Sequence, residues 1–316
     1  MSFQRRSFPN VLAGVRPGTV PTTSTGIPQL DPLLGGGIPL GSTLLLAEDT
    51  HNVYGRHLMK AFVAEGIAHG QRIFVINGES TLRFEELPRK VAYERSNAKP
   101  QGITDKMKIA FRYERLLEVE SLPEAETNHV FDYGLPIRPE ELEGADVHSC
   151  NAVTKTPAEI LCLVASNISK GKVLRVAVTV GLLVDHKFLR SLRVLARNEN
   201  VVCWVSVPAC LDDDSFRRLF AMADCAISLV AFSSAERQTN PLYKNYHGLL
   251  SLDKFAEINS VTSHRPESTE YIFHQTGRRF AIERLHMPPD LGSPGGPAPA
   301  LTMSCQTSGG SKALDF

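Results

Sequence analysis

The sequence predicts an α/β fold built on a mostly parallel, twisted sheet with helices on both faces. Short apolar runs without polar alternation are typical of strands that are buried on both faces. Amphipathic segments of helical length separate these runs as far as about residue 232. Beyond that point, strand-like segments follow one another without intervening helices. We therefore expect the sheet to finish in antiparallel strands.

The first strand and helix frame the turn on which the functional interpretation depends. The apolar run at 43–47 predicts an inner strand, and 53–69 predicts a helix that ends at Gly70. In nucleotide-hydrolysing proteins of this layout, the turn between them reads G-x-x-x-x-G-K-[ST], because backbone N–H groups and a Lys must meet the phosphates. Here the turn has no Lys-Ser/Thr pair and no glycine before Gly55.

Four residues make this turn a vestigial nucleotide site, namely Glu48, Asp49, Asn52 and Tyr54. The two adjacent acids would face incoming phosphates, and like charges at this spacing repel by ~1 kcal/mol in water. The turn therefore predicts a degenerate phosphate loop on an ATPase-like scaffold. Glu48 and Asp49 as a catalytic pair are disfavoured because adjacent turn residues rarely face one substrate.

The remaining elements follow in order. We expect strands at 72–77, 108–113, 173–180, 201–207, 225–232 and 246–255, and a hairpin at 271–285 that turns at 277–279. Helices are expected at 157–168, at 185–198 and after the three acids 212–214, which read as caps rather than catalytic groups. Residues 114–150 read as an irregular surface excursion, and 233–244 as a polar loop.

A single domain is expected over 21–290. Residues 1–20 contain three arginines and no acid, and they read as a flexible basic arm: either a frayed terminus or a contact for RNA or a partner. Residues 291–316 hold 12 Gly, Pro or Ser in 26 positions and predict a disordered tail.

Composition excludes several function classes. Lys plus Arg equals Asp plus Glu at 34 each, so any nucleic-acid binding must come from local patches. Six cysteines without a Cys-x-x-Cys pair favour reduced thiols in a cytosolic or nuclear protein. No apolar run reaches the ~18 residues of a membrane span, and the N-terminus has no signal-peptide core, so neither secretion nor membrane association is expected.

Motifs for catalysis or metal binding are not found. The sequence has no H-E-x-x-H, no G-x-S-x-G and no His/Cys set with zinc spacing, so neither a metal site nor a catalytic residue is predicted. Strand 173–180 does not end in a Mg²⁺-holding Asp, and only Asp185 could substitute. His51 reads as structural. The basic stripe of 185–198 is either a solvated face or a contact for RNA or another subunit; it consists of Lys187, Arg190, Arg193 and Arg197.

Several segments resemble known proteins. Residues 24–41 are similar to the opening of RecA/KaiC-like domains. Segments 2–6, 109–113 and 129–133 resemble the PAXNEB family of accessory Elongator subunits. The most specific matches to that family are 240–248 (Asn-Pro-Leu-Tyr-Lys-Asn-Tyr-His-Gly) and 282–290 (Ile-Glu-Arg-Leu-His-Met-Pro-Pro-Asp).

This resemblance implies a RecA-like, non-catalytic subunit of the Elongator complex. It implies a heterohexameric ring with Elongator subunits five and six, which binds tRNA and helps the catalytic subcomplex to modify the wobble uridine, U34. It implies no cofactor bound by this chain alone, ATP or ADP at ring interfaces, and a cytoplasmic location that can extend to the nucleus.

RecA-type rings direct the loop after the 225–232 strand into a central channel, which makes Arg237 and Lys244 the candidate tRNA contacts. Two alternatives stay open: an architectural subunit without tRNA contacts of its own, and an active RecA/KaiC-type ATPase, which would need the missing phosphate loop.

Overall fold

The computed structural model describes residues 20–51, 53–78, 81–91, 129–169, 171–179, 185–240, 243–258 and 264–284. All of them belong to one compact unit that extends to residue 285. The expected arm (except residue 20), the expected strand at 108–113 and the expected tail at 291–316 lie outside the described residues.

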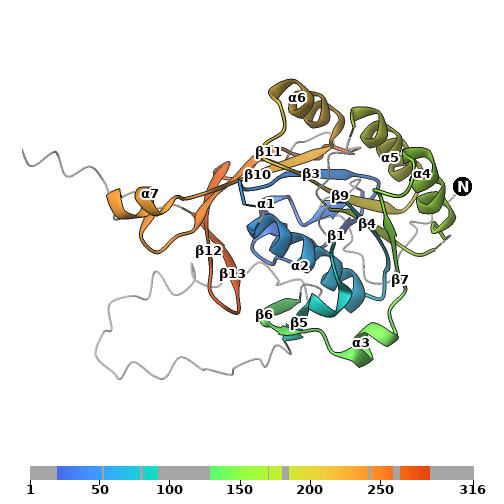
Figure 1. Cartoon of the computed structure of the whole chain (residues 1–316), viewed down its shortest axis with the longest axis horizontal. Helices are drawn as coiled ribbons and strands as arrows, with labels where there is room; N and C mark the ends of the chain where they lie inside the picture. Colours follow the sequence, from blue (N-terminus) through green and yellow to red (C-terminus); the bar gives the residue numbers. More distant parts are fainter. Residues whose placement is uncertain are drawn as a thin grey trace, which may run out of the picture. The chain divides into compact units, whose positions relative to one another are not determined.

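Within these ranges, nine strands form one sheet in the order β13-β12-β11-β10-β3-β9-β8-β4-β7 (Figure 1). Their bounds are β3 Thr43–Ala47, β4 Arg72–Asn77, β7 Val147–Asn151, β8 Leu174–Val178, β9 Val201–Val207, β10 Cys225–Ala231, β11 Gly248–Lys254, β12 Glu270–Gln275 and β13 Phe280–Glu283. The strands from β10 to β7 pair in parallel, and β11, β12 and β13 add antiparallel pairs. The predicted parallel sheet with an antiparallel end is therefore confirmed.

Helices cover both faces of the sheet, as predicted (Figure 1). Helix α2 (Tyr54–Ala68) packs on one face, where it meets Leu44 and Leu46 of β3. Helices α4 (Pro157–Ser166), α5 (His186–Asn198) and α6 (Asp213–Met222) pack on the other face with Leu45. Successive residues of β3 thus pack into the two cores on opposite faces of the sheet. This explains why the strand is apolar throughout rather than alternating between apolar and polar residues.

Shorter elements complete the unit. They are β1 (Thr22–Thr23), which pairs with β2 (Ile38–Pro39); β5 (Pro88–Val91), which pairs with β6 (Val130–Pro136); and α1 (Leu30–Leu33), α3 (Pro139–Glu143), α7 (Ser234–Thr239) and the 3₁₀ turn η1 (Phe84–Glu86).

The helix boundaries follow from local chemistry. Asp212 accepts a hydrogen bond from the backbone N–H of Ser215 at 3.0 Å, so the predicted capping role of this acid is confirmed. Helix α4 begins with a capping box between Thr156 and Glu159. Gly70 follows α2 with φ +64°, the left-handed conformation that ends many helices.

Two sequence predictions are wrong. The described part of 114–150 is not irregular, because it contains β6, α3 and the edge strand β7, which extends the main sheet beside β4. Half of the predicted loop at 233–244 is helix α7, which Ser233 and Glu236 begin with a capping box. In both places the elements are short and bury few residues, so their apolar periodicity is too weak to reveal them.

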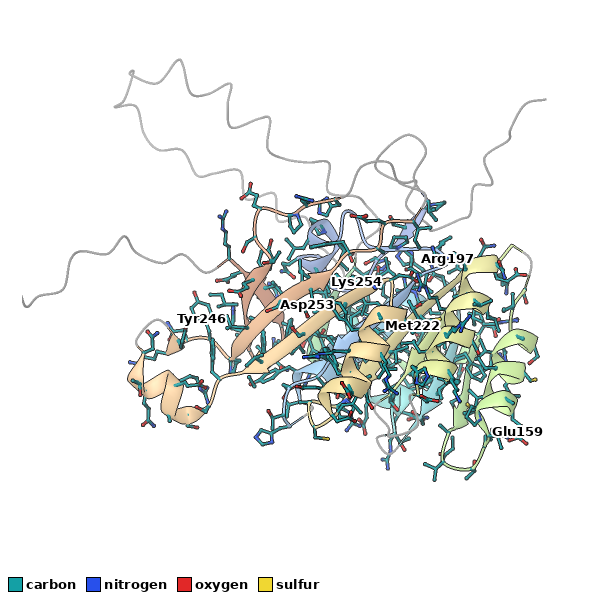
Figure 2. The ribbon with its side chains drawn as sticks, turned by 90° about the horizontal axis from the view of Figure 1, so that it is seen from above. Glu159, Arg197, Met222, Tyr246, Asp253 and Lys254 are labelled. Atoms are coloured by element: carbon teal, nitrogen blue, oxygen red, sulfur yellow. The ribbon has the colours of Figure 1, made fainter. Side chains whose placement is uncertain are left out.

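The C-terminus of α6 is closed by a lysine from the antiparallel strands. The Nζ of Lys254 donates hydrogen bonds to the carbonyls of Phe220 at 3.1 Å and Ala223 at 2.6 Å. Figure 2 shows Lys254 beside Met222, the last residue of α6. These bonds satisfy carbonyls that a helix end leaves without partners, and they join α6 to β11.

Candidate functional site

The vestigial turn lies between β3 and α2, and its acids are buried: Glu48 is 3% exposed and Asp49 is 2% exposed. Asp49 accepts backbone hydrogen bonds from Val53 at 3.3 Å, Tyr54 at 3.1 Å and Gly55 at 3.4 Å. These N–H groups belong to the start of α2, where unpaired donors and the helix dipole favour an anion. The Asp49 carboxylate therefore supplies the negative charge at this helix N-terminus.

Glu48 points into the protein beside the same helix. Its backbone N–H donates to the carbonyl of Val207 at 2.9 Å, and a Cβ at Gly55 would lie 2.8 Å from the Glu48 Cγ. The Oε2 atom has no hydrogen-bond partner among the described residues. Burial raises the pKa of Glu48 to about 8; the Ser206 hydroxyl opposes this shift and the Asp49 charge adds to it. Glu48 is therefore mostly protonated at neutral pH.

This protonation changes the expected picture of two repelling carboxylates that face a phosphate. Asp49 accepts hydrogen bonds from α2, whereas Glu48 is buried and neutral. Asn52, the third residue predicted for the turn, lies outside the described residues. His51 is exposed.

Tyr54 joins the start of α2 to the antiparallel strands. Its ring packs edge-on against Phe273 with centroids 4.9 Å apart, and lies 5.8 Å from the ring of His247. Burial raises the pKa of Tyr54, and the positive charge of Arg237 opposes this shift. Burial also lowers the pKa of His247, and Arg237 adds to that effect. Arg237 therefore acts electrostatically on the vestigial turn.

The two predicted tRNA contacts differ in setting. Arg237 is half-buried in the last turn of α7, and Lys244 is exposed beyond it. Figure 1 shows α7 projecting past the antiparallel strands β12 and β13. The structure thus relates Arg237 to Tyr54, although the sequence treated them as separate sites, and it leaves Lys244 on the surface.

The basic stripe on α5 is partly neutralised within the chain. Arg193 and Arg197 form ion pairs with Asp224 at 2.7 Å and 2.5 Å, while Lys187 and Arg190 are exposed. Asp185, weighed as a metal-holding acid, occupies the N-cap position of α5 and forms an ion pair with His186. Neither feature contributes to the vestigial turn.

Sequence reasoning missed a buried cluster at the other end of α2, formed by Glu65, His69 and His129. Glu65 is fully buried and receives a contact on each carboxylate oxygen: His69 Nε2 lies 2.9 Å from Oε1, and His129 Nδ1 lies 3.1 Å from Oε2. The centroids of the two imidazole rings lie 4.9 Å apart. Burial opposes ionisation of Glu65, but the hydrogen bonds and charges of the two histidines lower its pKa to about 2.

A buried arginine lies beneath the same helix. Arg175 donates to the Phe62 carbonyl at 3.0 Å and to the Thr23 hydroxyl at 2.7 Å, and it also bonds Gln71. A Cβ at Gly66 would lie 2.7 Å from the Arg175 Cδ, so this glycine lets the arginine pass under α2. Its charge helps to balance buried Glu65, with which it interacts electrostatically.

One signal for the cluster was present in the sequence. Glu65 and His69 are four residues apart, so a helix places them on one face. His129 is distant in sequence and reaches them only through the β5–β6 pair. The spacing of Cys and His along the sequence therefore gives no sign that His129 lies beside α2.

Within the described ranges, no helix has the length and apolar character needed to cross a bilayer.

Comparison with known proteins relates nearly the whole chain to one family. The model of the family described as PAXNEB protein matches residues 9–316. The chain is 31% identical to Elongator complex protein 4 of Xenopus laevis, with 100% of this chain and 95% of the relative covered. It is 30% identical to the protein of that name from Danio rerio (92% and 88% covered) and 29% identical to that from Homo sapiens (92% and 85% covered).

Proposed function

Because this chain belongs to the PAXNEB protein family, we propose that it serves as an accessory subunit of an Elongator complex. The observation that carries the proposal is the match to relatives named Elongator complex protein 4 across almost their full length.

The proposed role is non-catalytic, and the turn before α2 supports it. A nucleotide-hydrolysing site places phosphate at this helix N-terminus. Here Asp49 accepts hydrogen bonds from three of the N–H groups, and a bound phosphate would compete with a fixed carboxylate. We infer that the phosphate loop is degenerate and that this chain alone binds no nucleotide cofactor. ATP or ADP then belongs to ring interfaces, where partner subunits complete the site.

The proposal extends to a RecA-like heterohexameric ring with Elongator subunits five and six, which binds tRNA and supports U34 modification by the catalytic subcomplex. The mostly parallel sheet with helices on both faces is compatible with this fold. Such a role carries a cytoplasmic location that can include the nucleus. The family resemblance supports these assignments.

Native mass spectrometry tests the assembly. The chain is measured alone and after co-expression with subunits five and six, and we expect a particle with two copies of each. A stable monomer that fails to assemble would contradict the ring. In parallel, ATP is titrated into the isolated chain by calorimetry, and micromolar affinity would contradict the degenerate phosphate loop.

The tRNA contacts are assigned to Arg237 and Lys244, on and just beyond the projecting helix α7. Replacing both by Ala in the assembled ring should weaken tRNA binding and reduce the log–log salt slope by ~1.4–1.8 if each residue contacts one phosphate.

A matched control is Lys187→Ala plus Arg190→Ala, which removes two exposed positive charges from α5. Loss of affinity in the control alone would move the contact to α5. Unchanged affinity in both double variants would favour the architectural alternative, in which partner subunits hold the tRNA.

A further inference from the structure

The Glu65–His69–His129 cluster offers three metal-ligating side chains on a compact set of atoms. One carboxylate oxygen and one imidazole nitrogen from each histidine lie within 4.8 Å of one another. Two imidazoles and one carboxylate form a ligand set found in catalytic zinc sites, where a fourth position holds water. Imidazole nitrogen also suits other late first-row divalent metals.

The elements that carry the cluster hold it in place. Glu65 lies in the last turn of α2, and His69 is the C-cap residue one helical turn later, so their side chains share a face. His129 precedes β6, whose pairing with β5 brings it onto the helix. The side chains of Glu65 and His69 are 0% and 6% exposed, whereas that of His129 is 18% exposed. An ion would therefore have a route in from the His129 side.

We propose that Glu65, His69 and His129 form a binding site for a divalent metal ion of the zinc class. This site is separate from the vestigial turn, and the proposal does not depend on the Elongator role. The ion would replace the hydrogen bonds that now join the carboxylate to both rings.

Metal binding requires that the two ring nitrogens facing Glu65 carry no proton. Each of these protons moves to the other nitrogen of a neutral imidazole, or leaves to the solvent from an imidazolium. Glu65 binds the ion as a carboxylate, through the oxygen atoms that now face the two rings. Water supplies the fourth ligand.

Charges around the site act in both directions. The Arg175 guanidinium opposes a cation, but its hydrogen bonds go to Phe62, Gln71 and Thr23 rather than to Glu65. The carboxyl of Asp31 interacts electrostatically with Glu65. Burial raises the pKa of Asp31 to about 6, so at neutral pH this group is mostly ionised and favours a cation nearby. The rival explanation is that the histidines only neutralise a buried carboxylate, and it predicts no metal binding.

The test uses the full-length chain without an affinity tag, stripped of metal by a chelator and then titrated with Co²⁺. We expect one equivalent to bind with visible d–d absorption and without the near-ultraviolet band of thiolate ligation, and Zn²⁺ to displace it. Zn²⁺ should also raise the thermal midpoint, because it binds the folded state. His129→Gln should lower the Co²⁺ affinity at least ~10-fold, since one of three ligands is lost.

The matched control is His148→Gln. His148 also contacts a carboxylate, with its Nε2 2.9 Å from the Asp146 Oδ1, but it lies on β7 outside the cluster. This variant should bind Co²⁺ as the wild type does. Glu65→Gln is a second test of the cluster, and far-ultraviolet circular dichroism checks that each variant folds.

Two results would overturn the proposal. One is the failure of the folded wild type to bind Co²⁺ or to gain stability from Zn²⁺. The other is equal affinity in the wild type and His129→Gln, which would place the ion elsewhere. Neither result bears on assembly with subunits five and six, so the two proposals fail independently.

Discussion

Glu48→Gln tests whether the vestigial turn contains a neutral acid. Burial raises the pKa of Glu48 from its ordinary 4.5 to about 8 in the folded chain. Between these values the unfolded chain releases the proton while the folded chain keeps it. Folding stability from this group is thus fully present below about pH 4.5 and is lost as pH rises toward 8. Each unit of the shift is worth ~1.4 kcal/mol, so the full loss is about 5 kcal/mol.

Gln has the shape of a protonated Glu but does not titrate. The variant should therefore match the wild type near pH 4.5 and exceed it by about 4 kcal/mol at pH 8, rising to about 5 kcal/mol at higher pH, because only the wild type must bury an ionising group. Urea unfolding across this pH range measures the difference between the two proteins. Taking the difference cancels the contributions of all other titrating groups.

Glu257→Gln serves as the control, because this exposed glutamate should change stability by less than ~0.5 kcal/mol at any pH. A pH-independent difference between Glu48→Gln and the wild type would refute the reasoning. It would mean that Glu48 is ionised in the folded chain and that the turn contains two negative charges.

Five further substitutions at four positions test capping, packing and ion pairing by urea unfolding. Asp49→Ala should cost about 1 kcal/mol through loss of the α2 cap, whereas Asp49→Asn, which keeps an acceptor oxygen, should cost less; equal costs would argue against capping. Gly26→Ala should cost about 3 kcal/mol, because φ is +83° and the new Cβ would lie 2.4 Å from the Ala61 carbonyl oxygen. The control is Gly70→Ala, where φ is +64° but no atom lies near the new Cβ, and this change should cost only about 1 kcal/mol. Asp224→Asn should cost about 2 kcal/mol, because it weakens two ion pairs to arginines that are each 35% exposed. This cost should fall when salt is added, and a cost that is the same at low and high salt would contradict an ionic origin.

The central architecture could be predicted because its signals are local and strong. The apolar runs of β3, β4 and β9 contribute to the cores on both faces of the sheet, so each strand can be recognised from its own sequence. The segment β7 could not be recognised because it is an edge strand with an exposed outer side, and only its pairing with β4 makes it part of the sheet. Helix α7 is too short for periodicity, although its capping residues are present in the sequence.

The candidate site also has features that the sequence predicts and features that it does not. The departure from the phosphate-loop pattern could be read directly, since a missing Lys and two acids are facts of sequence. The direction in which each acid points could not be predicted from the sequence, because adjacent residues in a turn face different surroundings. Asp49 bonds the helix that follows, whereas Glu48 is buried beside Gly55. The raised pKa of Glu48 is a consequence of its burial in the folded chain.

Helix α2 is held at both ends by side chains of the chain itself. Asp49 bonds its first N–H groups, and Glu65 and His69 near its end contact His129. In a nucleotide-hydrolysing protein the first of these anchors is a phosphate, so the helix responds to the ligand. A carboxylate in the chain is always present, and the position of this helix then has no reason to change with nucleotide. If the chain assembles into the proposed ring, we expect amide hydrogen exchange in α2 to be the same with and without ATP, so that any response to nucleotide arises in other subunits. Protection of α2 that changes on adding ATP would contradict this, and would show that the helix start still senses phosphate despite Asp49.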